Sequence, residues 1–328
     1  MIGRYPTPVE KLDGSSTQAS ELWVKRDDRT GEAYGGNKVR KLEHILEQAR
    51  KAGVRRIITV GAAGSHHVLA TTLYGKRMGL RVAAVLTPQP RTRHVVDNLR
   101  AAVGLGLEAH GARSMPEVAR KVFALRGPGD LVVPPGGSSL TGTKGYIDAA
   151  RELAHDIREG RLPPPDAIVV ALGSGGTAAG LLAGLAHEGI AARLIAVRIV
   201  DPVMTGRWRL LALALAAARE AKIPIDPVKL ARQVEVDTRW LGPGYGHSTE
   251  AGERAMAIGR EQGLKLDPTY TAKTFAAALD RVASGRHRRV LYWHTLSSAP
   301  LEPLLENAPK EEDLPRELRA LFARATRS

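Results

Sequence analysis

The sequence predicts an α/β protein built on parallel β-sheets with helical crossovers. Short apolar, β-branched runs alternate with longer runs of helical periodicity through most of the 328 residues. This alternation is typical of parallel strands that are joined by helices. The length allows one large α/β domain or two of ordinary size, and a hydrophobic fraction of 43% is ample for a core. No internal repeat or low-complexity tract interrupts the pattern.

In the first half of the chain, short apolar runs predict four strands, at residues 22–25, 57–60, 82–86 and 131–133. Longer periodic runs predict a helix from Lys38 and further helices at about 65–78, 95–103, 117–125 and 142–159, the last of which ends at Gly160. A domain change is expected near this last helix. The proline run at 163–165 cannot continue a helix and leads into the next strand.

In the second half, strands are predicted at 167–172, 194–200, 234–236 and 290–293. Helices are expected from Thr177 and at about 210–221, 248–262 and 272–282, with a terminal helix at 314–325. The two halves therefore share the same alternation, as expected for a chain made of parallel sheets and crossover helices.

The composition excludes several classes of function. There is no cysteine, which removes disulfides, thiolate nucleophiles and every cysteine-based metal site. The most apolar segment, residues 210–218, is far shorter than the ~20 residues that cross a bilayer, and the N-terminus has no apolar stretch of signal-peptide length. A soluble, cytoplasmic protein with no membrane partner is expected.

A formal charge of +14 raises nucleic acid as a partner, because phosphate neutralisation drives most non-specific binding. The basic residues are scattered, however, and aromatic residues make up only 4% of the chain, which leaves little to stack bases on. Scattered surface arginine is the favoured interpretation, and nucleic acid is not an expected partner.

Residues 35–43, Gly-Gly-Asn-Lys-Val-Arg-Lys-Leu-Glu, carry the clearest functional signal. Asn37 is a preferred N-cap residue, so a helix should begin at Lys38. Three cations, Lys38, Arg40 and Lys41, then occupy the first turn, where the helix macrodipole favours carboxylates. At about 100° per residue, Lys38 shares a narrow stripe with four apolar residues, Leu42, Ile45, Leu46 and Ala49. An inward lysine among misplaced cations indicates a site for an anionic ligand.

A second anion site is predicted at Gly173, Ser174, Gly175, Gly176 and Thr177, between the strand 167–172 and the next helix. Glycines at this position expose backbone N–H groups at a helix N-terminus, which suits a phosphate. The same loop satisfies G-x-G-x-x-[GA], so a dinucleotide site is an alternative, with Asp201 as a late candidate for the ribose. That alternative leaves Lys38 unexplained, whereas a phosphorylated aldehyde cofactor would use both features.

Taken together, these features resemble a fold-type II pyridoxal-phosphate enzyme, and more narrowly the D-cysteine desulfhydrase and aminocyclopropane-carboxylate deaminase family. The resemblance runs from about Pro8 to Pro300. Six blocks carry it: 24–28 (Val-Lys-Arg-Asp-Asp), 35–43, 65–67 (Ser-His-His), 135–139 (Pro-Gly-Gly-Ser-Ser), 173–177, and 267–273 (Asp-Pro-Thr-Tyr-Thr-Ala-Lys) with His294 and Thr295.

The resemblance implies a role for each matching residue. Lys38 would carry pyridoxal 5'-phosphate, and Lys41 with Gly173, Ser174, Gly175, Gly176 and Thr177 would hold its phosphate. Thr295 would place a neutral hydroxyl opposite the pyridine nitrogen. Ser65 would receive the substrate carboxylate, and Ser65 and Tyr270 would position the substrate and handle protons. The catalytic set is thus Lys38, Ser65 and Tyr270.

Two stretches depart from the family pattern. Where the family has glutamine-serine-asparagine-histidine, this chain has Gly64, Ser65, His66 and His67, so His66 replaces the asparagine that hydrogen-bonds the cofactor's phenolic oxygen. The donor capacity of a histidine depends on its protonation state. Two family glycines after Thr295 are replaced by Leu296 and Ser297, which should narrow the space beside the ring. His66 and His67 point about 100° apart on a helix, so no metal is assigned.

The resemblance implies two open, twisted, mostly parallel sheets flanked by helices, as in tryptophan synthase β. A large cofactor-binding domain is expected at 1–46 and 151–328, a small domain at 47–150, and the assembly is expected to be a homodimer. The expected reaction is α,β-elimination on a small amino acid with a β-leaving group, as in D-cysteine desulfhydrase, giving pyruvate, ammonia and sulfide.

Several alternatives to this reaction stay open. Tyr270 is followed by Thr271, as in the desulfhydrases, whereas the deaminases have glutamate there. Deamination of aminocyclopropane carboxylate or another pyridoxal-phosphate deaminase or sulfo-lyase reaction is the nearest alternative. From other classes come a nicotinamide-dinucleotide oxidoreductase and a basic nucleic-acid-binding protein. A cofactor-binding homologue with little catalysis is a further possibility, because of His66 and Leu296.

Overall fold

The computed structural model describes residues 2–202 and 205–323. The chain forms two compact units, the first made of Met1–Lys41 and Leu140–Ala299, the second of Leu42–Ser139 and Pro300–Ser328. These bounds differ from the expected domains in three places. Residues 42–46 belong to the second unit rather than the first. Helix α5 (Leu140–Arg158) belongs as a whole to the first unit, and the residues after 299 belong to the second.

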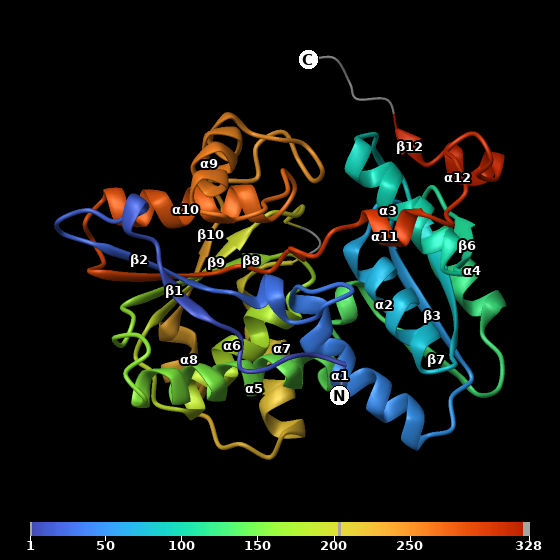
Figure 1. Cartoon of the computed structure of the whole chain (residues 1–328). Helices are drawn as coiled ribbons and strands as arrows, with labels where there is room; N and C mark the ends of the chain where they lie inside the picture. The colour runs from blue at the N-terminus through green and yellow to red at the C-terminus, as the bar shows by residue number, and fades with distance from the viewer. Residues whose placement is uncertain (1, 203–204, 324–328) are drawn as a thin grey trace. The chain divides into compact units, whose positions relative to one another are not determined.

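A six-stranded sheet organises the first unit, in the order β1-β2-β11-β8-β9-β10 (Figure 1). The strands are β1 (Val9–Lys11), β2 (Glu21–Lys25), β11 (Arg289–Trp293), β8 (Ala167–Leu172), β9 (Arg193–Arg198) and β10 (Val234–Asp237). Only the pairing of β1 with β2 is antiparallel. The expected parallel sheet is therefore confirmed, with β1 as an added edge strand.

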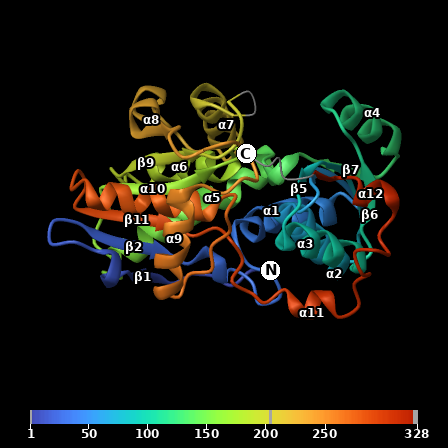
Figure 2. The ribbon, with the colours of Figure 1, turned by 90° about the horizontal axis from the view of Figure 1, so that it is seen from above.

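Helices cover both faces of this sheet (Figures 1 and 2). One core lies against α5, α6 (Gly176–His187), α7 (Arg207–Glu220) and α8 (Pro227–Gln233). The other lies against α9 (Glu250–Glu261) and α10 (Thr271–Ala283). Burial on both faces explains why the strands read as continuous apolar runs rather than as alternating ones.

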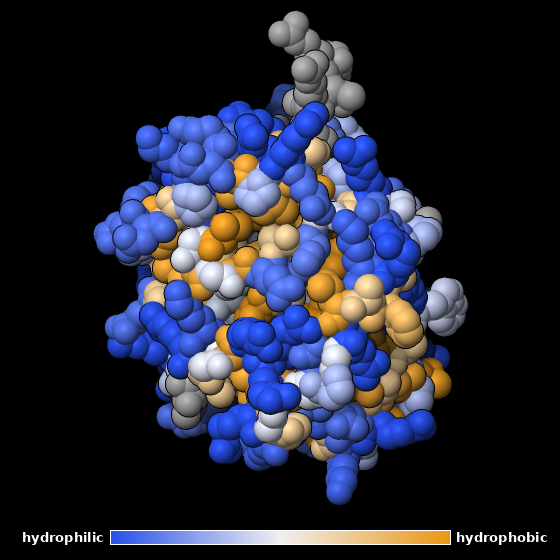
Figure 3. Space-filling view, turned by 90° about the vertical axis from the view of Figure 1, so that its right-hand side faces the viewer, coloured by the Kyte–Doolittle hydropathy of each residue, from blue (hydrophilic) through white to orange (hydrophobic). Residues whose placement is uncertain are grey.

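The second unit contains a four-stranded parallel sheet in the order β6-β4-β3-β7. Its strands are β6 (Glu108–Gly111), β4 (Arg81–Thr87), β3 (Arg56–Ala62) and β7 (Asp130–Val133). Its larger helices are α2 (His66–Arg77), α3 (Arg93–Gly104) and α4 (Met115–Leu125). Helix α1 (Asn37–Lys51) begins in the first unit and continues into the second. Figure 3 shows apolar side chains among hydrophilic ones on one face of the molecule.

The predicted terminal helix at 314–325 is wrong. Among its described residues, 314–323, only Arg316–Arg319 (α12) form an α-helix, and Phe322–Ala323 (β12) then pairs with Gln89–Pro90 (β5). Residues 324–325 of the prediction lie outside the described part of the chain. Contacts with the second unit override the local helical periodicity, because Leu318 and Leu321 are buried there. Another short helix, α11 (Glu302–Leu305), precedes α12 in the chain.

No helix in the described ranges is both long and apolar enough to cross a membrane.

Candidate functional site

The turn before Lys38 is held by the residues that follow β11. The N–H of Asn37 donates to the carbonyl oxygen of Thr295 at 3.0 Å, and the N–H of Gly35 donates to Ser297 Oγ at 2.7 Å. Gly36 has a φ of +86°, and a Cβ there would lie 2.6 Å from the Thr295 oxygen. Only glycine meets both conditions. The position of Thr295 and Ser297 thus fixes where helix α1 begins.

Lys38 is joined to the glycine loop through Asn37. Its Nζ donates to Asn37 Oδ1 at 2.8 Å, and Asn37 Nδ2 donates to Thr177 Oγ1 at 2.9 Å. The helix begins at Asn37, one residue earlier than predicted, and the side chain of Asn37 serves this bridge. The predicted apolar stripe of Leu42, Ile45, Leu46 and Ala49 is confirmed as buried. One chain of hydrogen bonds therefore connects two of the stretches that the sequence singled out.

The two lysines of this turn have unusual pKa values. Burial lowers the pKa of Lys38 to about 8, although the nearby carboxylate of Asp267 opposes the shift. Lys41 is 1% exposed, and burial, with a smaller effect from the adjacent Lys38 charge, lowers its pKa well below the ordinary value. The charged forms of these amines are poorly solvated, so an anion bound beside them would be stabilised.

The glycine loop connects β8 to α6 as the sequence predicted. Gly175 precedes the helix in the left-handed conformation, with φ +97° and ψ −29°. A Cβ on Gly173 would lie 3.2 Å from Cε1 of Tyr270, so the loop runs close to that ring. Gly176 and Thr177 form the first turn of α6, where backbone N–H groups point out of the helix end. This arrangement suits a phosphate.

Tyr270 pairs with a second tyrosine, Tyr245, which no sequence motif indicated. Its Oη donates to Tyr245 Oη at 2.9 Å, and the two rings meet edge to face with centroids 5.7 Å apart. Burial raises the pKa of Tyr245 to about 12 and that of Tyr270 well above its ordinary value, so both hydroxyls keep their protons. The loop of Tyr245 is held by Lys273, whose Nζ donates to the carbonyl of Leu241 at 2.7 Å. In the sequence, Tyr245 lies between Gly244 and Gly246, and this isolated aromatic residue in a glycine-rich loop was the one signal for it.

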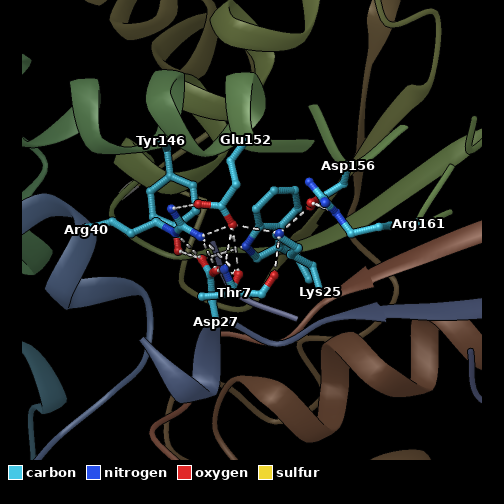
Figure 4. Close-up of polar contacts among 9 residues, drawn as sticks. Thr7, Lys25, Asp27, Arg40, Tyr146, Glu152, Asp156 and Arg161 are labelled. Atoms are coloured by element: carbon cyan, nitrogen blue, oxygen red, sulfur yellow. Dashed lines mark hydrogen bonds and ion pairs between the residues drawn. The ribbon is translucent and has the colours of Figure 1, made fainter. Parts of the chain in front are cut away.

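A buried network of charged and aromatic side chains holds α1 through Arg40 (Figure 4). Asp27 accepts from Nε and Nη2 of Arg40 at 2.9 and 2.7 Å, and from Tyr146 Oη at 2.7 Å. Glu152 of α5 accepts from Nη1 and Nη2 of the same arginine, both at 2.9 Å. Further bonds come from Thr7, Lys25 and Trp293. Arg40 was predicted as part of an anion site, but its guanidinium is paired with the carboxylates of Asp27 and Glu152. It also contacts Thr7 Oγ1 and the ring of Tyr5.

Ser65 and His66 belong to the second unit, whereas Lys38, Lys41, residues 173–177, Tyr270 and Thr295 belong to the first. Ser65 caps α2, where its Oγ accepts from the N–H of Val68 at 3.4 Å. His66 Nε2 lies 2.8 Å from His94 Nε2, while the buried His67 bonds Thr59 at 2.9 Å. Across residues 2–202 and 205–323, no three His, Cys, Asp or Glu side chains are grouped so that they could hold a metal ion.

Comparison with known proteins assigns the chain to a family. The model of the family described as pyridoxal-phosphate dependent enzyme matches residues 1–295. The chain belongs to this family. A D-cysteine desulfhydrase of Salmonella newport is 32% identical over 305 residues, covering 88% of this chain and 91% of that protein. A protein of Pyrococcus horikoshii, provisionally named as a 1-aminocyclopropane-1-carboxylate deaminase, is 33% identical over 304 residues, or 89% of each chain.

Solved structures agree with the fold-type II architecture. The crystal structure of an ACC deaminase homologue has a TM-score of 0.79 and 30% identity, and covers 94% of this chain and 95% of that one. A fungal L-serine ammonia-lyase of Rhizomucor miehei has a TM-score of 0.64 at 16% identity, over 93% and 98% of the two chains. The second likeness concerns the fold alone.

The first unit of this pyridoxal-phosphate dependent enzyme fits its cofactor on structural grounds. An aldehyde needs a neutral amine to react with, and the lowered pKa of Lys38, about 8, makes the neutral form predominant above about pH 8. A phosphate needs N–H donors and positive charge, which the first turn of α6 and Lys41 can provide. The bridge through Asn37 holds the amine and the glycine loop at a fixed separation.

Proposed function

We propose that this enzyme catalyses α,β-elimination on a small amino acid with a β-leaving group, in the manner of a D-cysteine desulfhydrase. For cysteine, the products with one water would be pyruvate, ammonia and hydrogen sulfide. The 32% identical desulfhydrase of Salmonella newport supports this choice. Thr271 supports it too, because the deaminases have a glutamate at this position. Here the position carries no carboxylate, and the threonine hydroxyl donates to Asp267 Oδ1 at 2.7 Å.

The observation that carries the proposal is the amine of Lys38. Its pKa of about 8 lets it accept a proton near neutral pH and return one later. Asn37 Oδ1 orients the amine at 2.8 Å and ties it to Thr177 in the predicted phosphate site. A base that is both oriented and close to its operating pH is what proton abstraction from Cα requires.

Each remaining residue then has a defined task in this proposal. Bound pyridoxal phosphate supplies an electron sink for the pair that is left at Cα when its proton departs. Lys38 accepts that proton, and the Cβ–S bond breaks with its electron pair leaving on sulfur. Residues 173–177 and Lys41 bind the phosphate, and Thr295 offers a neutral hydroxyl to the pyridine nitrogen. The N-terminus of α2 at Ser65 binds the substrate carboxylate.

Tyr270 and Tyr245 act together in the proposal. Because burial raises both pKa values, the pair keeps its protons at neutral pH. Tyr270 donates its O–H to Tyr245, so the O–H of Tyr245 is left to donate a hydrogen bond to the leaving sulfur. The hydrogen bond of 2.9 Å between the hydroxyls keeps the phenol of Tyr270 in one orientation. His66, at the position of the family's asparagine, is proposed to bind the cofactor as well.

Borohydride reduction of the loaded enzyme tests the role of Lys38. We expect the purified protein to be yellow, and reduction followed by mass spectrometry to find the cofactor on the peptide that contains Lys38. The Lys38→Ala variant should lose this product, while Lys265→Ala, which changes an exposed lysine, should keep it. A wild-type protein that takes up no cofactor, or carries it on another lysine, would refute the proposal.

Deamination of 1-aminocyclopropane-1-carboxylate is the second candidate function. The protein of Pyrococcus horikoshii and the solved deaminase homologue favour it. A panel of D- and L-amino acids with β-leaving groups, together with aminocyclopropane carboxylate, separates the two. Elimination gives pyruvate, whereas ring opening gives 2-oxobutanoate. Silence on the whole panel from correctly loaded enzyme would favour a cofactor-binding homologue with little catalysis.

A further inference from the structure

The turn that carries Ser65 and His66 is held by two buried amide side chains. The N–H of Gly64 donates to Gln89 Oε1 at 3.0 Å, and the carbonyl oxygen of Gly64 accepts from Asn98 Nδ2 at 2.9 Å. Gln89 is 5% exposed and Asn98 is 2% exposed. A Cβ on Gly64 would lie 2.6 Å from Cα of Val95. Both the N–H and the carbonyl group of Gly64 are therefore held, and helix α3 lies directly against this residue.

The same helix contacts His66 through His94. The two Nε2 atoms are 2.8 Å apart, and the ring centroids are 4.6 Å apart with the planes tilted by 39°. A hydrogen bond between two neutral imidazole nitrogens needs a proton on one of them and a lone pair on the other. The two rings must therefore be in different tautomers.

Asn98 decides which ring donates. The Gly64 carbonyl only accepts, so the atom 2.9 Å away must be the nitrogen of the Asn98 amide. The same nitrogen lies 3.3 Å from His94 Nε2 and directs a donor toward it. If His94 Nε2 carried a proton, that proton would face the amide N–H. His94 Nε2 is consequently the acceptor, and the proton between the two rings belongs to His66.

We propose that Asn98 and His94 are positioning residues that fix His66 in the tautomer with its proton on Nε2. The single lone pair of His94 Nε2 accepts mainly from His66 Nε2 at 2.8 Å and more weakly from Asn98 Nδ2 at 3.3 Å. The main hydrogen bond of Asn98 Nδ2 goes to the carbonyl oxygen of Gly64 at 2.9 Å. His66 then has its lone pair on Nδ1, and His94 has its proton on Nδ1. This assignment follows from hydrogen-bond polarity within the second unit.

The chemical consequence rests on the proposed function, in which His66 takes the place of an asparagine. An asparagine amide nitrogen donates, but Nδ1 of this tautomer accepts. A cofactor phenolic oxygen that binds at His66 would then be favoured with its proton on. The absorption spectrum of bound pyridoxal phosphate reports that proton, since its near-ultraviolet and visible bands change in ratio.

Nitrogen NMR tests the proposal without any need for activity. In protein with ¹⁵N-labelled histidine, long-range proton–nitrogen correlation spectra distinguish the two neutral tautomers. The signals are assigned with the variants His66→Asn and His94→Gln, and are recorded at pH 8 with and without cofactor. We expect His66 to carry its proton on Nε2 and His94 on Nδ1. The reverse assignment, or an even mixture on both rings, would overturn the proposal.

Asn98→Leu removes the amide that sets the direction while keeping a side chain of similar size. We expect both rings to become tautomer mixtures in this variant, and the two absorption bands of the bound cofactor to change in ratio. Gln48→Leu, an amide-to-leucine change on the exposed face of α1, is the matched control and should leave both readouts unchanged. If Asn98→Leu does not fold, Asn98→Ser gives the same comparison. An unchanged single tautomer in the variant would contradict the assigned role.

Failure of this proposal and failure of the proposed function give different results. Protein that shows the two expected tautomers but takes up no pyridoxal phosphate would refute the function and support the role of Asn98. Protein that loads its cofactor on Lys38 but shows the reverse tautomers would do the opposite.

Discussion

At the scale of single residues, Lys38 combines two properties that usually conflict. Desolvation favours the neutral amine and lowers its pKa to about 8, while the flexible four-carbon side chain of a lysine does not by itself fix the direction of that amine. The 2.8 Å hydrogen bond to Asn37 Oδ1 gives it a fixed direction. Asn37 is held in turn by Thr177, so the orientation of the amine depends on the loop predicted to bind phosphate.

We predict that the rate of cofactor uptake by cofactor-free protein depends on pH through Lys38. Only the neutral amine reacts with an aldehyde, and lowering the pKa makes this form predominant above about pH 8. The uptake rate should rise about tenfold per pH unit below 8 and level off above it. Stopped-flow absorbance between pH 7 and 10 measures this profile.

The control for that experiment is Lys38→Arg, which should show no uptake at any pH in the range. A wild-type rate that continues to rise toward the ordinary lysine pKa of 10.5 would show that burial does not shift the pKa. The lowered pKa places the plateau of the uptake rate at lower pH than for an ordinary lysine, whereas a raised pKa would move it to higher pH.

Some site residues could be predicted from local sequence patterns, and others could not. Lys38 and residues 173–177 could be found because each breaks or satisfies a local rule. The departures at Gly64 and Ser297 could only be noted. The structure gives a reason for both, since Val95 excludes a Cβ at Gly64 and Ser297 Oγ accepts from the N–H of Gly35. These partners are distant in sequence, so no local pattern predicts them.

At the scale of elements, the network around Asp27 joins β2, α1 and α5. The 3-10 turn that follows β2 carries Asp27, α1 carries Arg40, and α5 carries Tyr146 and Glu152. Burial alone would raise the pKa of Glu152, but Arg40 and Lys25 lower it to about 2. Close helix contact accompanies these bonds, because a Cβ on Gly145 of α5 would overlap the carbonyl of Arg40. The helix that carries Lys38 is thus fixed to its neighbours by charge and by packing.

We predict that Asp27→Asn destabilises the protein by about 3–5 kcal/mol, the usual cost of leaving a buried charge without its partner. The carboxylate accepts from Arg40, Tyr146, Trp293 and Thr7, and an asparagine amide nitrogen would face some of these donors. Urea unfolding, followed by circular dichroism, measures the loss.

Glu47→Gln is the matched control for Asp27→Asn. Glu47 also pairs with an arginine, Arg50, at 2.8 Å, but both side chains are exposed. Exposed pairs contribute little to stability. If the two variants unfold at the same urea concentration, the buried network does not stabilise α1.

The elements themselves could largely be predicted, and the exceptions are informative. The buried central strands and amphipathic helices follow from periodicity, whereas β1, β5, β6 and β12 are short strands with weak local signals. Tyr245 was missed because its partner Tyr270 lies 25 positions away and its loop has no regular period. The loop is positioned by Lys273, which the sequence placed in a predicted helix and in the 267–273 block without indicating this contact.

At the scale of the whole molecule, the segment after residue 299 returns to the second unit. Arg91 pairs with Glu311 at 2.8 Å, and the N–H of Gln89 donates to the carbonyl of Leu321 at 3.0 Å. Gln89 is also the residue whose side chain accepts from Gly64. The family model ends at residue 295, so this segment lies beyond the match. Its local periodicity alone led to the wrong prediction of a long helix.

We predict that a chain ending at residue 299 keeps a stable first unit but loses stability in the second. Leu314, Leu318 and Leu321 are each at most 3% exposed, and burying one such side chain contributes about 1.5–3 kcal/mol. Hydrogen exchange followed by mass spectrometry should find faster exchange in β3 and β4, and unchanged exchange in β8 and β9. A chain ending at residue 323 keeps these leucines and should exchange like the full chain. Equal protection of β3 and β4 in all three chains would mean that the second unit is stable without its C-terminal segment.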